Sequence, residues 1–326
     1  MGDQPAVLEV KNLKKYFPVK EGIFKRTKGH VKAVNDISFE VQEHETFALV
    51  GESGCGKSTT GRSILRILEP SEGEVFFKGV NLLDYSKREF RKIRKDLQLI
   101  FQDPYSSLNP RMTVKKLLLE PLLTHGITNK KEAEQKVIEI AERVGLSREQ
   151  INRHPHEFSG GQRQRISIAR ALILHPQLVI LDEAVSALDV SIQAQILNLL
   201  IELQKDLKLT YVFISHDLNV VKHISDRVGV MYLGQMMELS NTEDLYHNPL
   251  HPYTQSLLSA IPSHDPSVKK ERIILKGDVP DPANPPSGCP FHLRCPKAHK
   301  RCTLEKPAFL EKESNHWVAC HLYDQE

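Results

Sequence analysis

The sequence lacks any apolar run long enough to cross a bilayer. The longest candidate, LLLEPLL from Leu117 to Leu123, is short and is interrupted by Glu120 and Pro121, whereas a spanning helix needs about 20 apolar residues. The first residues, MGDQPAVLEV, have no basic region followed by an apolar core, so we expect no secretory signal. Together these absences predict a protein that works in a reducing cytosol.

An excess of charge of one sign is also missing. The chain has 44 Lys and Arg against 41 Asp and Glu, a formal net charge of +3. A protein that coats nucleic acid by neutralising phosphates usually needs a larger excess of positive charge. We therefore expect no nucleic-acid partner.

Cysteine is scarce and unevenly placed. Only five of the 326 residues are cysteines, and four of them lie near the C-terminus, at Cys289, Cys295, Cys302 and Cys320. In a reducing compartment, clustered cysteines more often bind a metal than form disulfides.

Strand-like and helix-like patterns alternate along most of the chain. The segments TFALV (46–50) and LVILD (178–182) are continuous apolar runs, as expected of strands buried on both faces. Helical patterns cover 57–68 and 192–205. This alternation predicts an α/β fold with a largely parallel sheet.

Three segments depart from this alternation. The basic, glycine-containing segment EGIFKRTKGHVK (21–32) is predicted to be a hairpin insertion, and 104–173 is mostly helical. After about residue 242 the composition changes, and PSHDP and GDVPDPANPPSG are expected to be irregular linkers. We therefore expect one domain over 1–245, with a helical subdomain at about 104–173, and a C-terminal extension over 246–326.

A glycine-rich segment, GESGCGKST, lies between the TFALV run and a helical pattern. It fits G-x-x-x-x-G-K-[ST], in which glycines let backbone N–H groups surround a phosphate at a helix N-terminus. We expect Lys57 to reach the β- and γ-phosphates and the Ser58 hydroxyl to bind Mg²⁺. Cys55 is expected to be a small filler rather than a nucleophile. The predicted nucleotide contacts are Gly51, Ser53, Gly54, Cys55, Gly56, Lys57, Ser58 and Thr59.

An acidic pair, Asp182 and Glu183, lies at the end of the LVILD run. Asp182 ends the predicted strand, where its carboxylate can hold the hydration shell of Mg²⁺, and Glu183 follows it. A carboxylate at the second position can polarise a water for in-line attack on a γ-phosphate. Alone, such a pair would as readily cap a turn, but beside a phosphate loop the catalytic interpretation is favoured.

The segment FSGGQRQRISIARAL (158–172) supplies a second glycine-opened helix N-terminus, another anion-binding element. One nucleotide site does not need two such ends unless the second serves the nucleotide of another molecule. SGGQ resembles the signature motif of the ATP-binding cassette (ABC) ATPases, and the other motifs occur in that family's order. The resemblance covers roughly 7–240 and implies a RecA-like parallel sheet with an antiparallel β subdomain and a helical insert. It also implies that Ser159, Gly160, Gly161 and Gln162 contact the nucleotide of a facing cassette.

The same resemblance implies further roles. Gln102 in LIFQDP resembles the glutamine that contacts Mg²⁺ and water, and His216 in FISHDL resembles the histidine that contacts the γ-phosphate. Asp189 closes SALD, which resembles the family's D-loop. Ala184 departs from the proline found in many relatives, which affects turn stiffness rather than a reacting group. The resemblance thus gives Glu183, His216 and Gln102 as catalytic residues and Ser58, Gln102 and Asp182 as Mg²⁺ ligands.

Adenine stacking is expected from an aromatic residue in LKKYF. Phe17 aligns with the family's aromatic, and Tyr16 is the fallback. A buried strand aromatic remains the alternative for this position.

The tail resembles the C-terminal extension of oligopeptide and dipeptide importer ATPases. NPLHPYTQSLLSAIP (248–262) and PDPANPPSGCPFHLRCPKA (280–298) carry this likeness, and the segment 17–34 is most similar to the second ATPase subunit of such importers. The likeness implies a second ATPase subunit, two transmembrane permease subunits, an extracytoplasmic peptide-binding protein and a place on the cytoplasmic membrane face. DPYSSLNPRMTV (103–114) would form the docking groove for a permease. Nickel or glutathione importers, ABC proteins of DNA repair or translation, and a metal-dependent nucleic-acid-binding module stay open as alternatives.

The spacing of the four late cysteines, C-x5-C-x6-C-x17-C, fits neither the common zinc fingers nor the ferredoxin run. Four thiolates suit zinc or an iron–sulfur cluster, and His292, His299, His316 and His321 could compete as ligands. Free thiols or disulfides are a third possibility. The resemblance favours a [4Fe–4S] cluster, with Zn²⁺ as the alternative.

Overall fold

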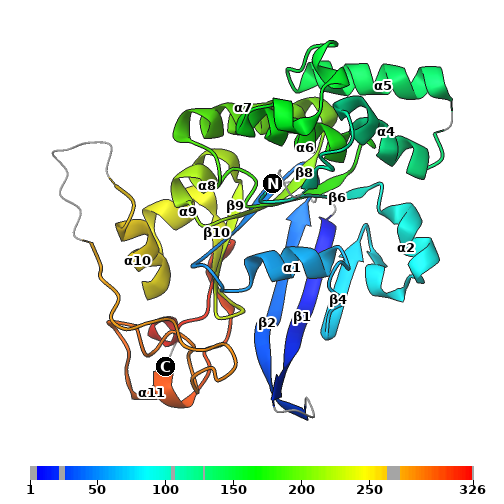
Figure 1. Cartoon of the computed structure of the whole chain (residues 1–326). Coiled ribbons are helices and arrows are strands. Elements are labelled where there is room, and N and C mark those ends of the chain that lie inside the picture. Colours follow the sequence, from blue (N-terminus) through cyan, green and yellow to red (C-terminus); the bar gives the residue numbers. More distant parts are fainter. Residues whose placement is uncertain (1–5, 22–25, 104–106, 128, 263–271, 325–326) are drawn as a thin grey trace. The chain divides into compact units, whose positions relative to one another are not determined.

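The computed structural model describes residues 6–21, 26–103, 107–127, 129–262 and 272–324 (Figure 1). The chain divides into two compact units. The first comprises Met1–Val7, Val41–Glu45 and Val80–Ile214, and the second comprises Leu8–Glu40, Thr46–Gly79 and Ser215–Glu326. Three predicted features fall partly outside the described residues: the tip of the hairpin at 22–25, part of the docking groove at 104–106, and most of the PSHDP linker.

The first unit contains parallel strands in the order β8 (Thr210–Ser215), β7 (Leu178–Asp182) and β6 (Leu97–Ile100). Leu178 lies opposite Leu97 on one side and Thr210 on the other. All five residues of β7 are buried, which confirms the expectation from the continuous apolar run LVILD. The long helix α7 (Val190–Leu207) belongs to the same unit and buries a stripe of leucines and one isoleucine.

Three helices of this unit pack on one another: α4 (Val114–Thr124), α5 (Lys130–Arg143) and α6 (Gly160–Leu172) (Figure 1). Each begins at a side chain that accepts a backbone N–H, namely Thr113, Asn129 and Ser159, as helix N-termini require. The helical character predicted for 104–173 is confirmed over its described residues. Short 3-10 turns at Gln150–Asn152 and Pro155–Glu157 lead into α6.

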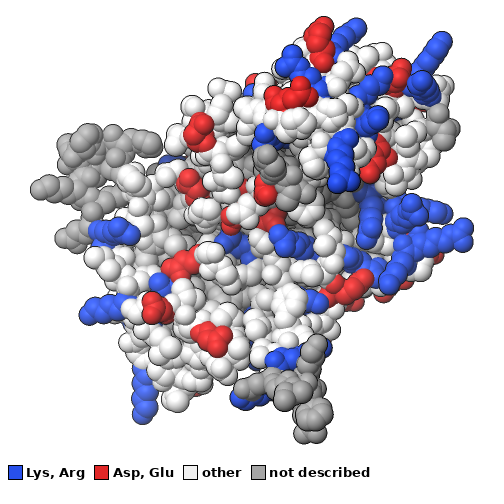
Figure 2. Space-filling model, in the orientation of Figure 1, with Lys and Arg blue, Asp and Glu red and all other residues white. Residues whose placement is uncertain are grey.

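A short basic helix, α2 (Lys87–Ile93), follows β5 (Val80–Asn81) and the 3-10 turn Leu82–Asp84. Phe90 is its one buried residue, and a Ser86–Glu89 capping box closes its first turn. Lysine and arginine side chains gather over α2 in the view of Figure 2. The exposed ones are Lys87, Arg88, Arg91, Lys92, Arg94 and Lys95.

The second unit contains two groups of strands. The antiparallel group includes β2 (Arg26–Gln42), β1 (Ala6–Glu21) and β4 (Glu72–Phe77), in that order. In the other group β3 (Thr46–Val50) pairs in parallel with β9 (Arg227–Tyr232), which pairs antiparallel with β10 (Gln235–Asn241). Helices α1 (Lys57–Ile64) and α8 (Leu218–Ile224) belong to this unit.

The C-terminal extension contains short helices and strands. It forms α9 (Thr242–His247), α10 (Pro252–Ser259), α11 (Lys300–Leu304), β11 (Leu310–Glu313), β12 (His316–Val318) and a 3-10 turn at His321–Tyr323. β12 pairs antiparallel with β10, and β11 pairs with β12. Strand β12 depends on pairing with a segment far away in the chain, and β11 depends on β12, which no local sequence pattern predicts. The extension also belongs to the same compact unit as the phosphate-loop segment 51–59; the boundary at 245/246 stays a prediction.

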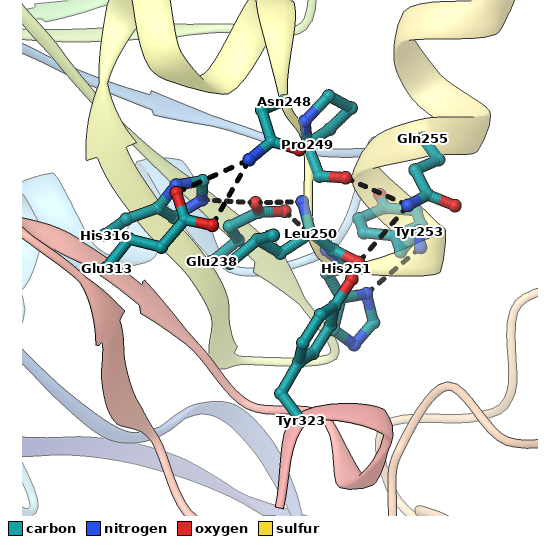
Figure 3. A network of polar contacts seen from close by, with 10 residues as sticks. All are labelled: Glu238, Asn248, Pro249, Leu250, His251, Tyr253, Gln255, Glu313, His316 and Tyr323. Carbon is teal, nitrogen blue, oxygen red and sulfur yellow. Dashed lines mark hydrogen bonds and ion pairs between the residues drawn. The ribbon is translucent and has the colours of Figure 1, made fainter.

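A buried carboxylate anchors the extension to β10. Glu238 is fully buried, and its oxygens accept hydrogen bonds from Leu250 N (2.6 Å), His251 N (3.0 Å) and His316 Nε2 (2.7 Å) (Figure 3). Tyr323 donates its hydroxyl to Leu250 O at 2.8 Å. A buried charge is tolerated only when it is well bonded, so these contacts fix the approach to α10 and strand β12 at one place.

Among the described residues, none of the helices is both long enough and apolar enough for a membrane span.

Candidate functional site

The phosphate loop joins β3 to α1, and the backbone around it leaves no room for side chains at two of its glycines. Gly51 and Gly56 have φ values of 146° and 106°. A Cβ on Gly51 would lie 2.2 Å from Met231 O, and one on Gly56 would lie 2.1 Å from Ala33 O. Two neighbouring strands thus back the loop so closely that only glycine fits, as the motif predicts.

The loop lysine is held at the centre of the loop. Lys57 is buried, and its ammonium donates to Gly51 O at 2.8 Å and Glu52 O at 3.0 Å. Its charge is therefore presented to the turn that would receive a phosphate.

Cys55, inside the loop, is buried, and burial raises the pKa of its thiol. A protonated, buried thiol is a poor nucleophile. This agrees with the expectation that Cys55 is a filler.

Helix α1 begins directly after the loop without a side-chain cap. Gly56 is its N-cap, no side chain there accepts a backbone N–H, and no acidic residue occurs in the first turn. The first backbone N–H groups of a helix need an external acceptor, and an anion is the natural one. The arrangement suits the phosphates of a nucleotide.

The two adenine candidates differ in their contacts. The Tyr16 hydroxyl donates to Asn35 Oδ1 at 2.7 Å, and burial raises its pKa. Phe17, the next residue of the strand, is half-buried, and Lys15 Nζ lies 5.1 Å from its ring centroid. Which of the two rings stacks on a base stays a prediction, with Phe17 first and Tyr16 as the fallback.

In the first unit, two predicted catalytic side chains come together. Gln102 Nε2 donates to Glu183 Oε2 at 2.9 Å. Glu183 has a left-handed backbone with φ 50°, and its N–H donates to Ile214 O at 3.0 Å. Asp182, at the end of β7, is buried. The carboxylate pair predicted from LVILDE therefore has one buried member and one turned toward Gln102.

The signature segment forms the exposed N-terminus of α6. Ser159 and Gln162 form a capping box: Gln162 N donates to Ser159 Oγ (3.4 Å), and Ser159 N donates to Gln162 Oε1 (3.1 Å). Ser159 and Gly160 are exposed. A Cβ on Gly161 would lie 2.4 Å from Ile192 Cγ2 of α7, so Gly161 permits close packing of two helices. The exposed end is available to a ligand carried by another molecule.

Asp189 and His216 precede helices. Asp189 Oδ1 accepts from Ile192 N (3.0 Å) and the Ser191 hydroxyl (2.8 Å), and these bonds lower its pKa. Its contacts in the structure are thus those of a cap for α7. His216 is exposed at the end of β8, one residue before Asp217, which caps α8.

The four late cysteines lie near one another and form no disulfide. Cys289 N donates to Cys302 O at 2.8 Å, and Gly288, with φ 67°, allows this approach. Burial raises the pKa of Cys289 to about 12, and the other three cysteines add to the shift. Among the residues that the structure describes, however, no three potential ligands converge where a single ion would sit.

The competing histidines are mostly engaged elsewhere. His316 Nε2 donates to Glu238, and both ring nitrogens of His321 have partners, Asp324 Oδ2 (2.8 Å) and Glu305 O (2.9 Å). His292 Nδ1 lies 2.8 Å from Cys289 O. At least one ring nitrogen of each of these three histidines therefore has a partner within the protein.

Sequence reasoning missed the side chains that support the phosphate loop. Tyr253 accepts at its hydroxyl the N–H of Glu52 (2.9 Å), and Arg294 pairs with the Glu52 carboxylate (2.7 Å). Both come from the C-terminal extension. No local pattern identifies them, because a residue's partner hundreds of positions away leaves no trace in periodicity or motif.

A phosphate loop, an acidic strand end with a glutamine, and a second glycine-opened helix define an ATP-hydrolysing cassette. Comparison with known proteins agrees. The ABC transporter family model matches residues 34–186, and the model for the oligopeptide/dipeptide transporter C-terminal region matches 237–302.

Individual relatives are similar over almost the whole chain. The oligopeptide transport ATP-binding protein AppF of Bacillus subtilis (strain 168) is 56% identical, with 98% of each chain covered. The dipeptide transport ATP-binding protein DppF of Haemophilus influenzae is 49% identical, with 98% of this chain and 97% of the relative covered. Among solved structures, the ATP-binding cassette MJ0796, a dimer in a post-hydrolysis state with ADP and Pi, has a TM-score of 0.64 at 28% identity over 72% of this chain and 98% of its own. The chain belongs to the ABC transporter family, among the ATP-binding proteins of oligopeptide and dipeptide transport.

Proposed function

We propose that the chain is the ATP-hydrolysing subunit of a membrane-bound ABC importer and powers the uptake of di- or oligopeptides. The observation that carries this proposal is the near full-length similarity to AppF, which includes the peptide-transporter C-terminal region. The phosphate loop and the Gln102–Glu183 contact supply the chemistry expected of such a subunit.

The proposed reaction is in-line hydrolysis of ATP. Backbone N–H groups of 51–59 and the Lys57 ammonium hold the phosphates, and Phe17 stacks on adenine. Glu183 accepts a proton from the attacking water as the water oxygen bonds to the γ-phosphorus and the bond to the β-phosphate oxygen breaks. Gln102 orients Glu183 and the water, and His216 contacts the γ-phosphate.

Magnesium would be held by hard oxygen donors. The Ser58 hydroxyl, the Gln102 amide oxygen and the Asp182 carboxylate are the donor types that Mg²⁺ prefers. When bound, the ion neutralises charge on the β- and γ-phosphates.

A second cassette is needed to complete each nucleotide site. The exposed end of α6, with Ser159, Gly160, Gly161 and Gln162, offers backbone donors to a nucleotide held by a facing subunit. We place Asp189 at the interface with that facing subunit as well. We infer a paralogous ATPase subunit as the partner. Two permease subunits and an extracytoplasmic peptide-binding protein would complete a complex on the cytoplasmic membrane face.

We further propose that Cys289, Cys295, Cys302 and Cys320 bind a [4Fe–4S] cluster, with Zn²⁺ as the alternative. Four unpaired thiols gathered in one short segment support this, since such sets bind zinc or iron–sulfur centres. In a tetrahedral zinc site with Zn–S bonds of about 2.3 Å, neighbouring sulfurs are roughly 3.8 Å apart. A [4Fe–4S] cluster separates its thiolates more widely than a single zinc ion does. Anaerobic purification followed by iron, sulfide and zinc analysis distinguishes the two, with Cys302→Ser expected to lose the metal and Cys55→Ser to retain it.

The transport proposal is tested by co-expression with the proposed permease subunits and paralogous ATPase. We expect a detergent-solubilised complex whose ATPase rate rises when peptide-loaded binding protein is added. Recovery with DNA or ribosomes, or stimulation by nickel or glutathione but not by peptides, would overturn it.

A further inference from the structure

The phosphate loop is tied to the C-terminal extension by an ion pair. Arg294 Nη1 and Nη2 donate to the Glu52 carboxylate at 2.7 and 3.2 Å. The side chains of Arg294 and Glu52 are only 10% and 27% exposed. A two-pronged arginine–carboxylate pair is among the stronger hydrogen-bonded contacts in proteins, and its partial burial limits screening by solvent.

Two aromatic hydroxyl groups complete the contact. Arg294 Nη1 donates to the Tyr232 hydroxyl at 3.4 Å, with the guanidinium 5.9 Å from the ring centroid. Glu52 N donates to the Tyr253 hydroxyl at 2.9 Å. Glu52 is therefore held at its carboxylate and at its backbone by the extension, and Tyr232 of β9 supports the arginine.

Glu52 in turn contacts the phosphate-binding lysine. Its carbonyl oxygen accepts from Lys57 Nζ at 3.0 Å. A short chain of contacts thus runs from Arg294 through Glu52 to Lys57. Displacement of Glu52 would move a carbonyl that orients the ammonium.

The segment that carries Arg294 is itself firmly packed. Arg294 N donates to Phe291 O at 3.0 Å. The Phe291 ring is 1% exposed and lies edge-on to Tyr232, at 5.3 Å, and 5.2 Å from Tyr253. The guanidinium is therefore presented to the loop from a fixed support.

The ion pair also neutralises a negative charge in the phosphate loop. Glu52 places a carboxylate in a loop built to bind phosphates, and its negative charge opposes nucleotide binding unless it is neutralised. Arg294 supplies that neutralisation from outside the cassette's own motifs.

We propose that Arg294 is a positioning residue for ATP binding: by pairing with Glu52 it fixes and neutralises the phosphate loop, so the C-terminal extension sets the nucleotide affinity of this subunit. The proposal rests on the proposed ATPase function but not on peptide transport.

The test measures the dissociation constant of a fluorescent ATP analogue, and KM and kcat for ATP, on the purified full chain or its complex. We expect Arg294→Ala to raise Kd and KM by about tenfold, equivalent to about 1.4 kcal/mol, with kcat changed less than twofold. Arg294→Lys should keep most of the affinity. In the Arg294→Ala background, Glu52→Gln should restore part of the affinity for ATP, because it removes the negative charge that Arg294 no longer neutralises.

A matched control is Arg301, which lies in the same extension and pairs with Glu305 and Asp324 instead of the loop. Arg301→Ala should leave Kd unchanged. A purely structural role for Arg294 would lower the melting temperature of Arg294→Ala while Kd and KM stayed within twofold of the native protein, and that result would overturn the proposal. If Arg294→Ala does not fold, Arg294→Gln decides, because it keeps a polar side chain and removes the charge that pairs with Glu52: Kd and KM within twofold of the native protein would contradict the proposal. Wild-type protein that binds no ATP would instead refute the proposed function.

Discussion

At the scale of single residues, the site depends on where Glu183 points. Its left-handed backbone, φ 50°, is costly for a residue with a side chain. The hydrogen bond from its N–H to Ile214 O holds that conformation, and Gln102 Nε2 donates a hydrogen bond to its carboxylate. A strained backbone at this position is consistent with a residue placed for chemistry rather than for folding.

Glu183→Gln should abolish hydrolysis while leaving nucleotide binding intact. The amide has nearly the same shape but cannot accept the proton of the attacking water, and loss of a general base costs about 10²–10⁴-fold in rate. Phosphate release and nucleotide affinity measure the two effects. Glu202→Gln, an exposed change on α7, is the control, and a Glu183→Gln rate above half the native value would refute the assigned role.

At the scale of elements, the signature helix is fixed by its contact with α7. Gly161 leaves no room for a methyl group against Ile192, whose branched side chain has little rotational freedom. Gly160, one residue earlier, has its nearest neighbour, Leu188, at 3.7 Å from a built Cβ. The second glycine of SGGQ therefore has a packing role that the motif alone does not reveal.

Gly161→Ala should lower the free energy of unfolding by about 1–3 kcal/mol, the usual cost of overpacking. Ile192→Ala in the same chain should recover most of that loss by removing the overlap. Gly160→Ala is the matched control and should shift stability by less than about 0.5 kcal/mol. Urea unfolding measures all four proteins, and equal destabilisation with and without Ile192→Ala would contradict this packing.

Some strands and loops of this protein can be predicted from the sequence, and others cannot. The strands β3 and β7 and the phosphate loop were predictable because an apolar run, a glycine pattern and a lysine lie within a few positions. β11 and β12 were not, because LEKE and HWV are short: HWV forms a strand by pairing with β10, far away in the chain, and LEKE by pairing with HWV. The Arg294–Glu52 pair was equally hidden, since 242 positions separate its members.

At the scale of the whole molecule, stability should depend on pH through a buried histidine. His251 caps α10, with Tyr253 N donating to its Nδ1 at 3.0 Å. Burial lowers its pKa from 6.5 to about 4, although the negative charge of Glu238 opposes the shift. The folded protein therefore keeps this imidazole neutral over a range in which the unfolded chain protonates it.

The unfolded chain binds a proton at this residue below about pH 6.5, and the folded chain does so only below about pH 4. The contribution of His251 to the free energy of unfolding is thus fully present above about pH 6.5. The free energy of unfolding should fall by about 3 kcal/mol as the pH drops to 4. His251→Asn keeps an acceptor for Tyr253 N, so its unfolding free energy should fall less over that window. His247→Asn, on an exposed side chain, should leave the slope unchanged. If the free energy of unfolding depends on pH identically in His251→Asn and in the native protein, His251 is not the source of this pH dependence.

At this same scale, ATP hydrolysis by this chain is expected to drive peptide import. The most direct measurement is uptake of a labelled peptide into proteoliposomes that contain the permeases, the paralogous ATPase and this subunit, with peptide-binding protein and ATP supplied on their proper sides. We expect ATP-dependent uptake that is lost with Glu183→Gln in this chain and unaffected by Glu202→Gln. Uptake that continues unchanged with Glu183→Gln, or absence of peptide uptake in an assembled complex that hydrolyses ATP, would contradict it.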